Sequence, residues 1–224
     1  LAVIIQDGLR RMYAEGENIF YYITLMNENY VNPPMPEREG VKEGILKGMY
    51  KFRVSEKKGA KHNAQLFGSG TILNEVIKAA QILEDKYSVA ADVWSITSYK
   101  QLYMDAISAE RHNLLNPEEQ ITPYITQSLQ NEKGVFVAAS DYVRTLPESV
   151  AKYVPGRFYT LGTDGFGRSE TREALRDFFE VDHRYVVVAT LKALADEGKI
   201  KFDVVKKAIK DLGIEPNKLN PLVS

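Results

Sequence analysis

Hydrophobic and polar positions follow two periods along most of the chain, and the two periods alternate. From residue 64 onward, short apolar runs rich in β-branched and aromatic residues predict buried strands. Longer runs with apolar residues three or four positions apart follow them and predict amphipathic helices. The predicted strands are 64–70, 92–97, 134–140 and 158–162, and the predicted helices are 71–87, 98–115, 146–154, 169–180, 182–198 and 203–213.

The run 182–198 fits both periods. Three consecutive valines, Val186 to Val188, favour a strand locally because β-branched side chains suit extended backbone. The length of the run, the cap-like Asp182 and small residues at helical spacing favour a helix, which is our prediction. Because strands alternate with helices, we predict an α/β fold with three layers, α/β/α, around a mostly parallel sheet of about five strands.

The first 63 residues follow a different pattern. Apolar residues at helical spacing predict a helix over 1–13, and the aromatic and β-branched run 18–25 predicts a buried strand. A short helix weakened by glycines is predicted over 37–52, with Val41, Ile45 and Met49 on one face. A polar, basic loop follows over 54–63, and we expect a domain boundary there. The predicted division is therefore 1–36, 37–63 and 64–224.

A polar lip formed by Asn27, Glu28 and Asn29 ends the strand predicted at 18–25. Three prolines within 33–36 follow it and predict a stiff connector. Ligands of α/β proteins gather at the carboxyl ends of strands, so the lip is a candidate binding rim. The alternative is that its two amides only cap the strand and satisfy backbone groups of the connector.

Charge and composition limit the classes of partner that the chain is expected to bind. The 29 basic side chains nearly balance the 30 acidic ones, so neither a nucleic acid nor a membrane surface is predicted as a partner. Cysteine is absent, which excludes disulfides and thiolate chemistry and fits a cytoplasmic location. The sequence has no convincing signal peptide and starts inside the pattern of a helix, so we expect a piece of a longer protein.

Two glycine-containing turns are candidate anion sites. Gly68-Ser69-Gly70 lies between a strand and a helix, but the sequence lacks the residues of a phosphate-binding loop, and a tight strand-to-helix turn explains it better. The loop 161–170 places Asp164, Arg168 and Ser169 before a helix, with Ser169 as the predicted cap. This loop could dock an anion or pack against a neighbouring subunit or domain.

The sequence gives little support for a metal site or for a catalytic base. No two histidines have the spacing of metal ligands, so no metal site is predicted. Glu110 or His112 could act as a base, but the pair also suits a polar helix end. The residues alone therefore predict an α/β module of unknown activity.

Several blocks of the sequence resemble one family. They are DGLRRMY, YYITLMNENYVNPPMPE, GILKGMYK, LFGSGTIL, YVPGRFYTLGTDGFGRSETREALRDFFEVD and NPLVS. In order and over nearly the whole chain, they resemble the C-terminal part of the homodimeric bacterial pyruvate dehydrogenase E1 components. These are transketolase-like, thiamin diphosphate-dependent enzymes.

The resemblance implies a fold and a set of partners. Residues 1–36 would be the tail of the pyrimidine-binding domain and the connector, 37–63 a linking helix and loop, and 64–224 a transketolase-like C-terminal domain. The implied reaction of the full-length enzyme is decarboxylation of pyruvate with thiamin diphosphate and magnesium, then reductive acetylation of the lipoyl group of E2, the dihydrolipoyl acetyltransferase. The implied partners are the remainder of the E1 chain, a second E1 subunit and E2.

The resemblance also implies that this chain lacks the catalytic machinery. The family's diphosphate motif, its catalytic glutamate and its histidine-rich segment have no counterpart here, so no catalytic, cofactor-binding or metal-binding residue is predicted and the chain alone is expected to be inactive. Asn27 stands where sugar-phosphate transketolases carry a phosphate-binding arginine. A neutral amide there would suit pyruvate, which has no phosphate.

Two other classes of function remain open at this stage. One is a stand-alone, non-catalytic α/β module for interaction or regulation. The other is a nucleotide-binding α/β protein that uses the turns at 68–70 and 162–167.

Overall fold

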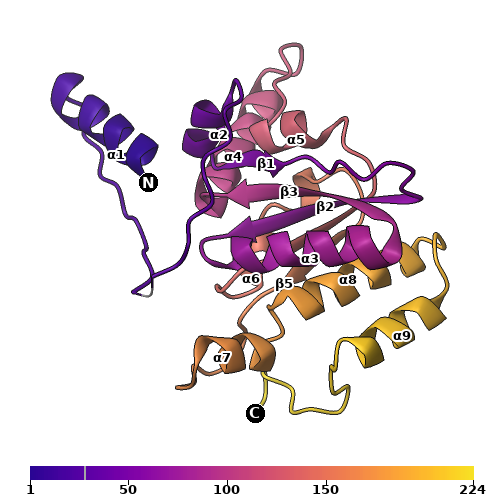
Figure 1. Ribbon diagram of the computed structural model, residues 1–224. Helices are drawn as coiled ribbons and strands as arrows, with labels where there is room; N and C mark the ends of the chain where they lie inside the picture. Colours follow the sequence, from indigo (N-terminus) through magenta and orange to yellow (C-terminus); the bar gives the residue numbers. More distant parts are fainter. Residues whose placement is uncertain (28) are drawn as a thin grey trace.

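The computed structural model describes residues 1–27 and 29–224, and its centre is a five-stranded sheet (Figure 1). The strand order is β1-β3-β2-β4-β5, and β2 to β5 are parallel while β1 runs antiparallel to β3. The strands are β1 (Met49–Arg53), β2 (His62–Ser69), β3 (Val89–Ile96), β4 (Val135–Ala139) and β5 (Phe158–Leu161).

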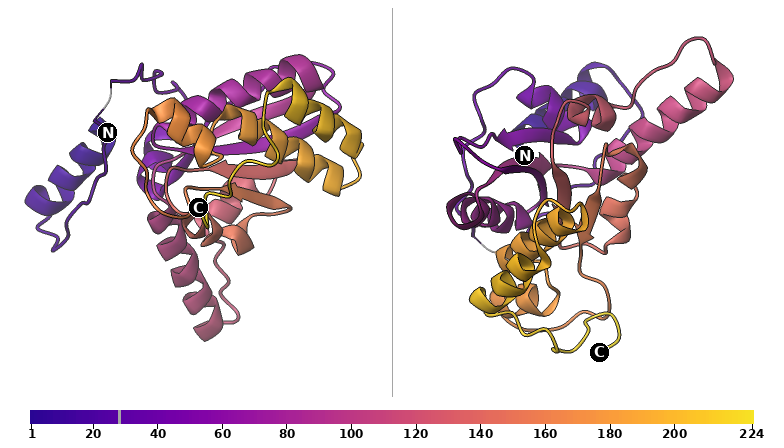
Figure 2. Two further views of the ribbon diagram at one scale, coloured as in Figure 1. Left: turned by 90° about the horizontal axis from the view of Figure 1, so that it is seen from below. Right: turned by 90° about the vertical axis from the view of Figure 1, so that its right-hand side faces the viewer.

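Helices cover both faces of this sheet. The α-helices are α1 (Ala2–Leu9), α2 (Val41–Lys47), α3 (Ile72–Tyr87), α4 (Tyr99–Leu115), α5 (Tyr124–Leu129), α6 (Thr145–Glu148), α7 (Arg172–Phe178), α8 (His183–Asp196) and α9 (Phe202–Asp211). A π-helical turn, Arg10–Ala14, continues α1, and a 3-10 turn, Ala151–Tyr153, follows α6. Helix α1 stands to one side of the layers, and the C-terminal end of α4 extends beyond them (Figures 1 and 2).

Two hydrophobic cores lie on opposite sides of the sheet because neighbouring residues of a strand face opposite ways. In β2, Leu66 belongs to the core under α3, α8 and α9, whereas Phe67 belongs to the core under α4 and α5. Both side chains are fully buried. The layers are therefore α/β/α, and the predicted mostly parallel five-stranded sheet is confirmed.

The ambiguous run 182–198 is helical. It forms α8, and the carboxylate of Asp182 accepts a hydrogen bond of 2.8 Å from the backbone nitrogen of Arg184. Val186 and Val187 are fully buried against the sheet. Their strand-like composition thus reflects burial inside the core and not an extended backbone.

Two predictions about the N-terminal part are wrong. The helix predicted over 37–52 ends at Lys47, where Gly48 takes a φ of +108°, and Met49 begins β1 instead. Residues 18–25 form no strand and are not buried: within the part of the chain that the structure describes, no strand pairs with them, and Phe20 and Tyr22 are exposed. The division 1–36, 37–63 and 64–224 stays a prediction, although β1 pairs within the sheet of the third segment.

Candidate functional site

The sheet changes its winding direction between β2 and β4. From β2 the chain continues to β3 on one side, and from β4 it continues to β5 on the other. In open α/β sheets the crevice at such a point, outside the carboxyl ends of the strands, is the usual place for a ligand. Ser69 ends β2 and Ser140 follows β4, and the buried hydroxyl of Ser69 donates a hydrogen bond of 2.9 Å to that of Ser140.

A carboxyl group follows this hydroxyl pair in the sequence. Asp141 follows Ser140, and burial raises the pKa of its carboxyl group. Its own backbone amide and the guanidinium groups of Arg176 and Arg172 only partly offset this effect. The carboxyl edge therefore combines hydroxyl, carboxyl and guanidinium groups within the C-terminal domain.

The N-terminal segment lies against this same edge. The hydroxyl of Thr24 is 2.7 Å from that of Tyr142, which lies in the loop after β4. Asn27 accepts a hydrogen bond of 3.2 Å from Arg172 at the start of α7. One turn further along α7, Arg176 donates a hydrogen bond of 3.1 Å to the hydroxyl of Tyr30. The stretch that contains the lip thus contacts the site although it comes from another part of the sequence.

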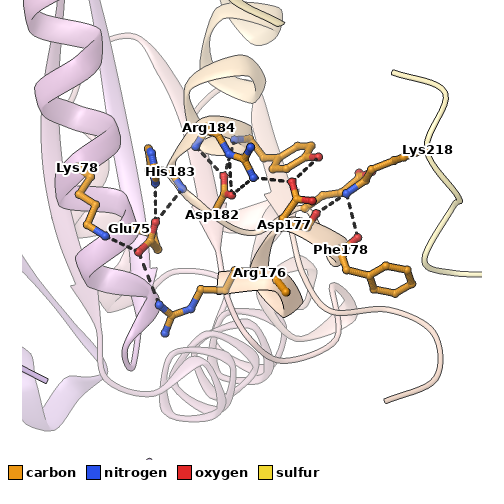
Figure 3. Close-up of polar contacts among 12 residues, drawn as sticks. Glu75, Lys78, Arg176, Asp177, Phe178, Asp182, His183, Arg184 and Lys218 are labelled. Carbon is orange, nitrogen blue, oxygen red and sulfur yellow. Dashed lines mark hydrogen bonds and ion pairs between the residues drawn. The ribbon is translucent and has the colours of Figure 1, made fainter. Parts of the chain in front are cut away.

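Glu75 of α3 is the centre of the ion pairs behind this edge (Figure 3). Its carboxylate accepts hydrogen bonds of 2.7 Å from His183 and 2.8 Å from Lys78, and Arg176 lies 3.6 Å away. Burial alone would raise the pKa of Glu75, but the hydrogen bonds from His183 and Lys78 outweigh it and lower the pKa to about 2. Glu75 is therefore a carboxylate at neutral pH and holds three cationic or polar partners in place.

The structure places the predicted lip residues only in part. Asn27 lies at the edge, beside Arg172, and Asn29 is exposed. Glu28 lies outside the described residues. The predicted role of Asn27, Glu28 and Asn29 at the rim of a substrate channel stays a prediction.

The side chains of the loop 161–170 contact residues after β4 and in α7. Asp164 accepts a hydrogen bond of 2.9 Å from the backbone of Arg144, and the guanidinium of Arg168 covers the ring of Phe178 at 4.8 Å. The prediction that Ser169 caps the next helix is wrong: Thr171 caps α7, accepting a hydrogen bond of 3.3 Å from the backbone of Ala174. The cap differs because α7 begins at Arg172, two residues later than the sequence predicts.

The same loop packs against the C-terminal residues of its own chain. A side-chain carbon at Gly165 would lie 2.0 Å from the carbonyl oxygen of Pro221. A cavity of about 400 Å³ lies here, and its lining includes Arg144, Asp164, Lys218 and Asn220. The predicted anion or subunit contact of this loop remains a prediction.

Sequence reasoning missed Tyr30, Glu75, Arg176 and His183. One signal was present: Arg172 and Arg176 are four residues apart, so they share one face of the predicted helix. That spacing predicts two guanidinium groups aimed at one neighbour. Nothing local identifies Tyr30 or Glu75 as that neighbour, because both are distant in sequence.

The side chains of the described residues, 1–27 and 29–224, do not form a site for a magnesium ion. Within 1–27 and 29–224, no three histidine, aspartate or glutamate side chains are grouped so that they could hold a metal ion. No step of a reaction is therefore assigned to a cofactor on these residues. None of the helices in the same described ranges has the length and apolarity needed to cross a membrane.

Comparison with known proteins gives consistent matches. Residues 48–182 match the model of the transketolase-like TK C-terminal domain, and residues 1–33 match that of the pyruvate dehydrogenase E1 component middle domain. The chain is 50% identical to the pyruvate dehydrogenase E1 component of Cupriavidus necator and 49% identical to that of Pseudomonas aeruginosa. Each alignment covers 99% of this chain and 25% of the relative, so the chain spans a quarter of the length of these curated relatives.

A solved structure with a related fold is the transketolase from Leishmania mexicana. It is 19% identical, with a TM-score of 0.46, over 69% of this chain and 19% of its own. The resemblance to pyruvate dehydrogenase E1 components that the sequence blocks predict is confirmed by the curated relatives.

Proposed function

Because this chain belongs to the transketolase-like TK C-terminal domain family, we propose that it forms the C-terminal part of a pyruvate dehydrogenase E1 enzyme. The observation that carries the proposal is the 50% identity to an E1 component over 99% of the chain. The match includes both the lip and the domain against which the lip packs.

The proposed reaction of the complete enzyme has two stages. Pyruvate is decarboxylated with thiamin diphosphate and magnesium, and the acetyl group is then transferred with reduction of the lipoyl group of E2. Thiamin diphosphate supplies the carbon nucleophile for such chemistry when it is bound. The groups that hold it belong to other parts of the enzyme, and we place the enzyme in the cytoplasm, consistent with the absence of cysteine.

The role proposed for this chain is structural. It forms the rim of the channel that leads to the reaction centre, contributes to the contact with a second E1 subunit and helps to place E2. The exposed apolar side chains of the N-terminal segment support this role. Leu1, Leu9, Phe20, Tyr22 and Leu25 are all more than half exposed, and they would be buried against the rest of the E1 protein.

Asn27 is the proposed rim residue that faces the substrate. It is neutral and lies at the carboxyl edge, in contact with Arg172. An uncharged amide binds a phosphate less well than a guanidinium group does, and pyruvate has no phosphate. Asn27→Ala in the complete enzyme is expected to raise the KM for pyruvate, whereas unchanged kinetics would refute the role of Asn27.

A chimera tests the proposal as a whole. In it, this chain replaces the matching quarter of the Cupriavidus necator enzyme. With thiamin diphosphate and magnesium, the chimera is expected to turn over pyruvate and to acetylate a lipoyl domain. A folded, dimeric chimera without either activity would refute the proposal and favour a non-catalytic module.

The isolated chain provides the complementary measurement. Calorimetric titration with thiamin diphosphate and magnesium is expected to show no saturable binding, and the chain alone is expected not to consume pyruvate. Turnover by the chain alone would contradict the division of roles proposed here.

A further inference from the structure

Arg176 links three elements that are far apart in the sequence. From α7 its guanidinium donates hydrogen bonds of 3.1 Å to Tyr30 and 3.2 Å to the hydroxyl of Thr71, the residue before α3. It also lies 5.5 Å from the centre of the Tyr30 ring, within the range of a cation–π contact. Its side chain is only 15% exposed, so these contacts are shielded from water.

Glu75 forms a buried ion pair with Arg176. The Glu75 side chain is 6% exposed, and one of its oxygens lies 3.6 Å from the Arg176 guanidinium. The other oxygen accepts hydrogen bonds from the backbone and the ring of His183, at 3.2 and 2.7 Å. Because Glu75 is fixed by α3 and α8 together, the guanidinium has a rigid base within the domain.

Two weaker contacts lie at the same carboxyl edge of the sheet. Thr24 reaches Tyr142, and Asn27 reaches Arg172, but both pairs are exposed to solvent. Exposed polar pairs contribute little to fixing a segment, whereas part-buried and charge-assisted ones contribute more. The contact of Tyr30 with Arg176 is therefore the strongest of the three.

We infer that Arg176 is a positioning residue: held by Glu75, it fixes Tyr30, and thereby the nearby Asn27 and Asn29, against the carboxyl edge of the sheet. The C-terminal domain would then act on the rim of the substrate channel without contacting the substrate. The consequence for pyruvate rests on the proposed function, whereas the fixing of Tyr30 does not.

Lysine could not replace arginine in this role. The planar guanidinium reaches Tyr30, Thr71 and Glu75 at once through separate nitrogen–hydrogen groups. An ammonium group has three donors but no planar fork, so lysine is expected to keep the ion pair with Glu75 and to lose the simultaneous contacts with Tyr30 and Thr71. Arg176→Lys therefore keeps the positive charge at this position but removes the contacts that fix Tyr30, so it distinguishes the two effects.

The first measurement uses the 224-residue chain and its lack of cysteine. Spin labels at Asn29→Cys and Asp85→Cys, both exposed positions, report the distance between the lip and the rigid helix α3. The unaltered background is expected to give one narrow distance peak, and Arg176→Lys is expected to abolish it. Lys78→Met is the matched control, because Lys78 contacts the same carboxylate but lies on the exposed side of α3.

Two outcomes would overturn the inference. One is an unchanged narrow peak in Arg176→Lys, and the other is an equal broadening in Lys78→Met. Should Arg176→Lys fail to fold, Tyr30→Phe decides, since it removes a hydroxyl outside both hydrophobic cores. The peak is expected to broaden in Tyr30→Phe, and a narrow peak there would refute the role of the hydrogen bond.

The second measurement uses the active chimera. Arg176→Lys is expected to raise the KM for pyruvate about five- to tenfold, the effect of losing roughly one hydrogen bond, with little change in kcat. An unchanged KM would overturn the link to the substrate. If the unaltered chimera does not turn over pyruvate, the proposed function fails, while the spin-label result still decides whether Arg176 fixes Tyr30.

Discussion

The indole nitrogen of Trp94 donates a hydrogen bond of 2.7 Å to the side-chain oxygen of Gln65. Gln65 is 3% exposed and Trp94 5% exposed, so the pair lies inside the core beneath α4. The amide nitrogen of Gln65 in turn donates to the carbonyl oxygen of Lys133, at 3.2 Å. This polar pair joins β2 to β3 and to the residues that precede β4.

Replacing Gln65 by leucine is expected to destabilise the domain by about 1–3 kcal/mol, because it leaves the buried Trp94 donor without an acceptor. Urea unfolding checks this directly, since Trp94 is the single tryptophan and reports its own environment by fluorescence. Gln81→Leu is the control, because Gln81 is exposed on α3. Equal stability of the Gln65→Leu and Gln81→Leu variants would contradict the prediction.

The hydroxyl pair at the carboxyl edge predicts an order of stabilities. Ser140→Ala removes the acceptor of two donors, the Ser69 hydroxyl and the Tyr142 backbone nitrogen. Ser69→Ala removes only a donor, so it is expected to cost less than Ser140→Ala, for which we expect about 1–3 kcal/mol. Thermal unfolding of both variants measures the order, and the reverse order would show that the Ser140 hydroxyl is not the shared acceptor.

The loop 161–170 predicts a conformational effect. Gly165 has a φ of +99° and lies so close to Pro221 that a methyl group would meet its carbonyl oxygen. Gly165→Ala is therefore expected to displace the C-terminal residues and to make them more sensitive to proteolysis. Gly167→Ala, at an open position of the same loop, is the control and is expected to behave like the unaltered chain.

Much of the fold could be predicted because the local pattern and the packing agree. The strand around Leu66 and the helix around Val76 both combine the right period with full burial. The cap and the length of the run around Val187 predict the helix that forms, although its composition favours a strand. In each case the information lies within one continuous stretch of sequence.

The errors come from contacts that local patterns do not contain. Met49 continues the four-residue spacing of Val41 and Ile45, but its neighbour in the structure is Ile96 of β3. Likewise, the sequence predicts Asn27 at the end of a strand over 18–25, whereas the structure places it beside Arg172, and the pairing of Arg176 with Tyr30 joins residues 146 positions apart. The strand at Met49 and the contact of Arg176 with Tyr30 therefore both depend on residues that are distant in sequence.

The buried carboxylate of Glu75 predicts a pH dependence of stability. Its pKa is about 2 in the folded chain, compared with an ordinary value of 4.5. The folded state thus binds this proton less readily than the unfolded state. The stabilisation is fully present above pH 4.5 and is lost as the pH falls from 4.5 toward 2.

Glu75→Gln tests this assignment, because glutamine keeps the size of the side chain but carries no titrating proton. At neutral pH the unaltered chain is expected to be more stable than Glu75→Gln, and the difference should shrink as the pH falls below 4.5. Chemical unfolding at a series of pH values measures it. Glu118→Gln, which changes an exposed carboxylate after α4, is the matched control. A stability difference between the unaltered chain and Glu75→Gln that stays constant down to pH 2 would show that the ion pairs of Glu75 do not stabilise its charged form.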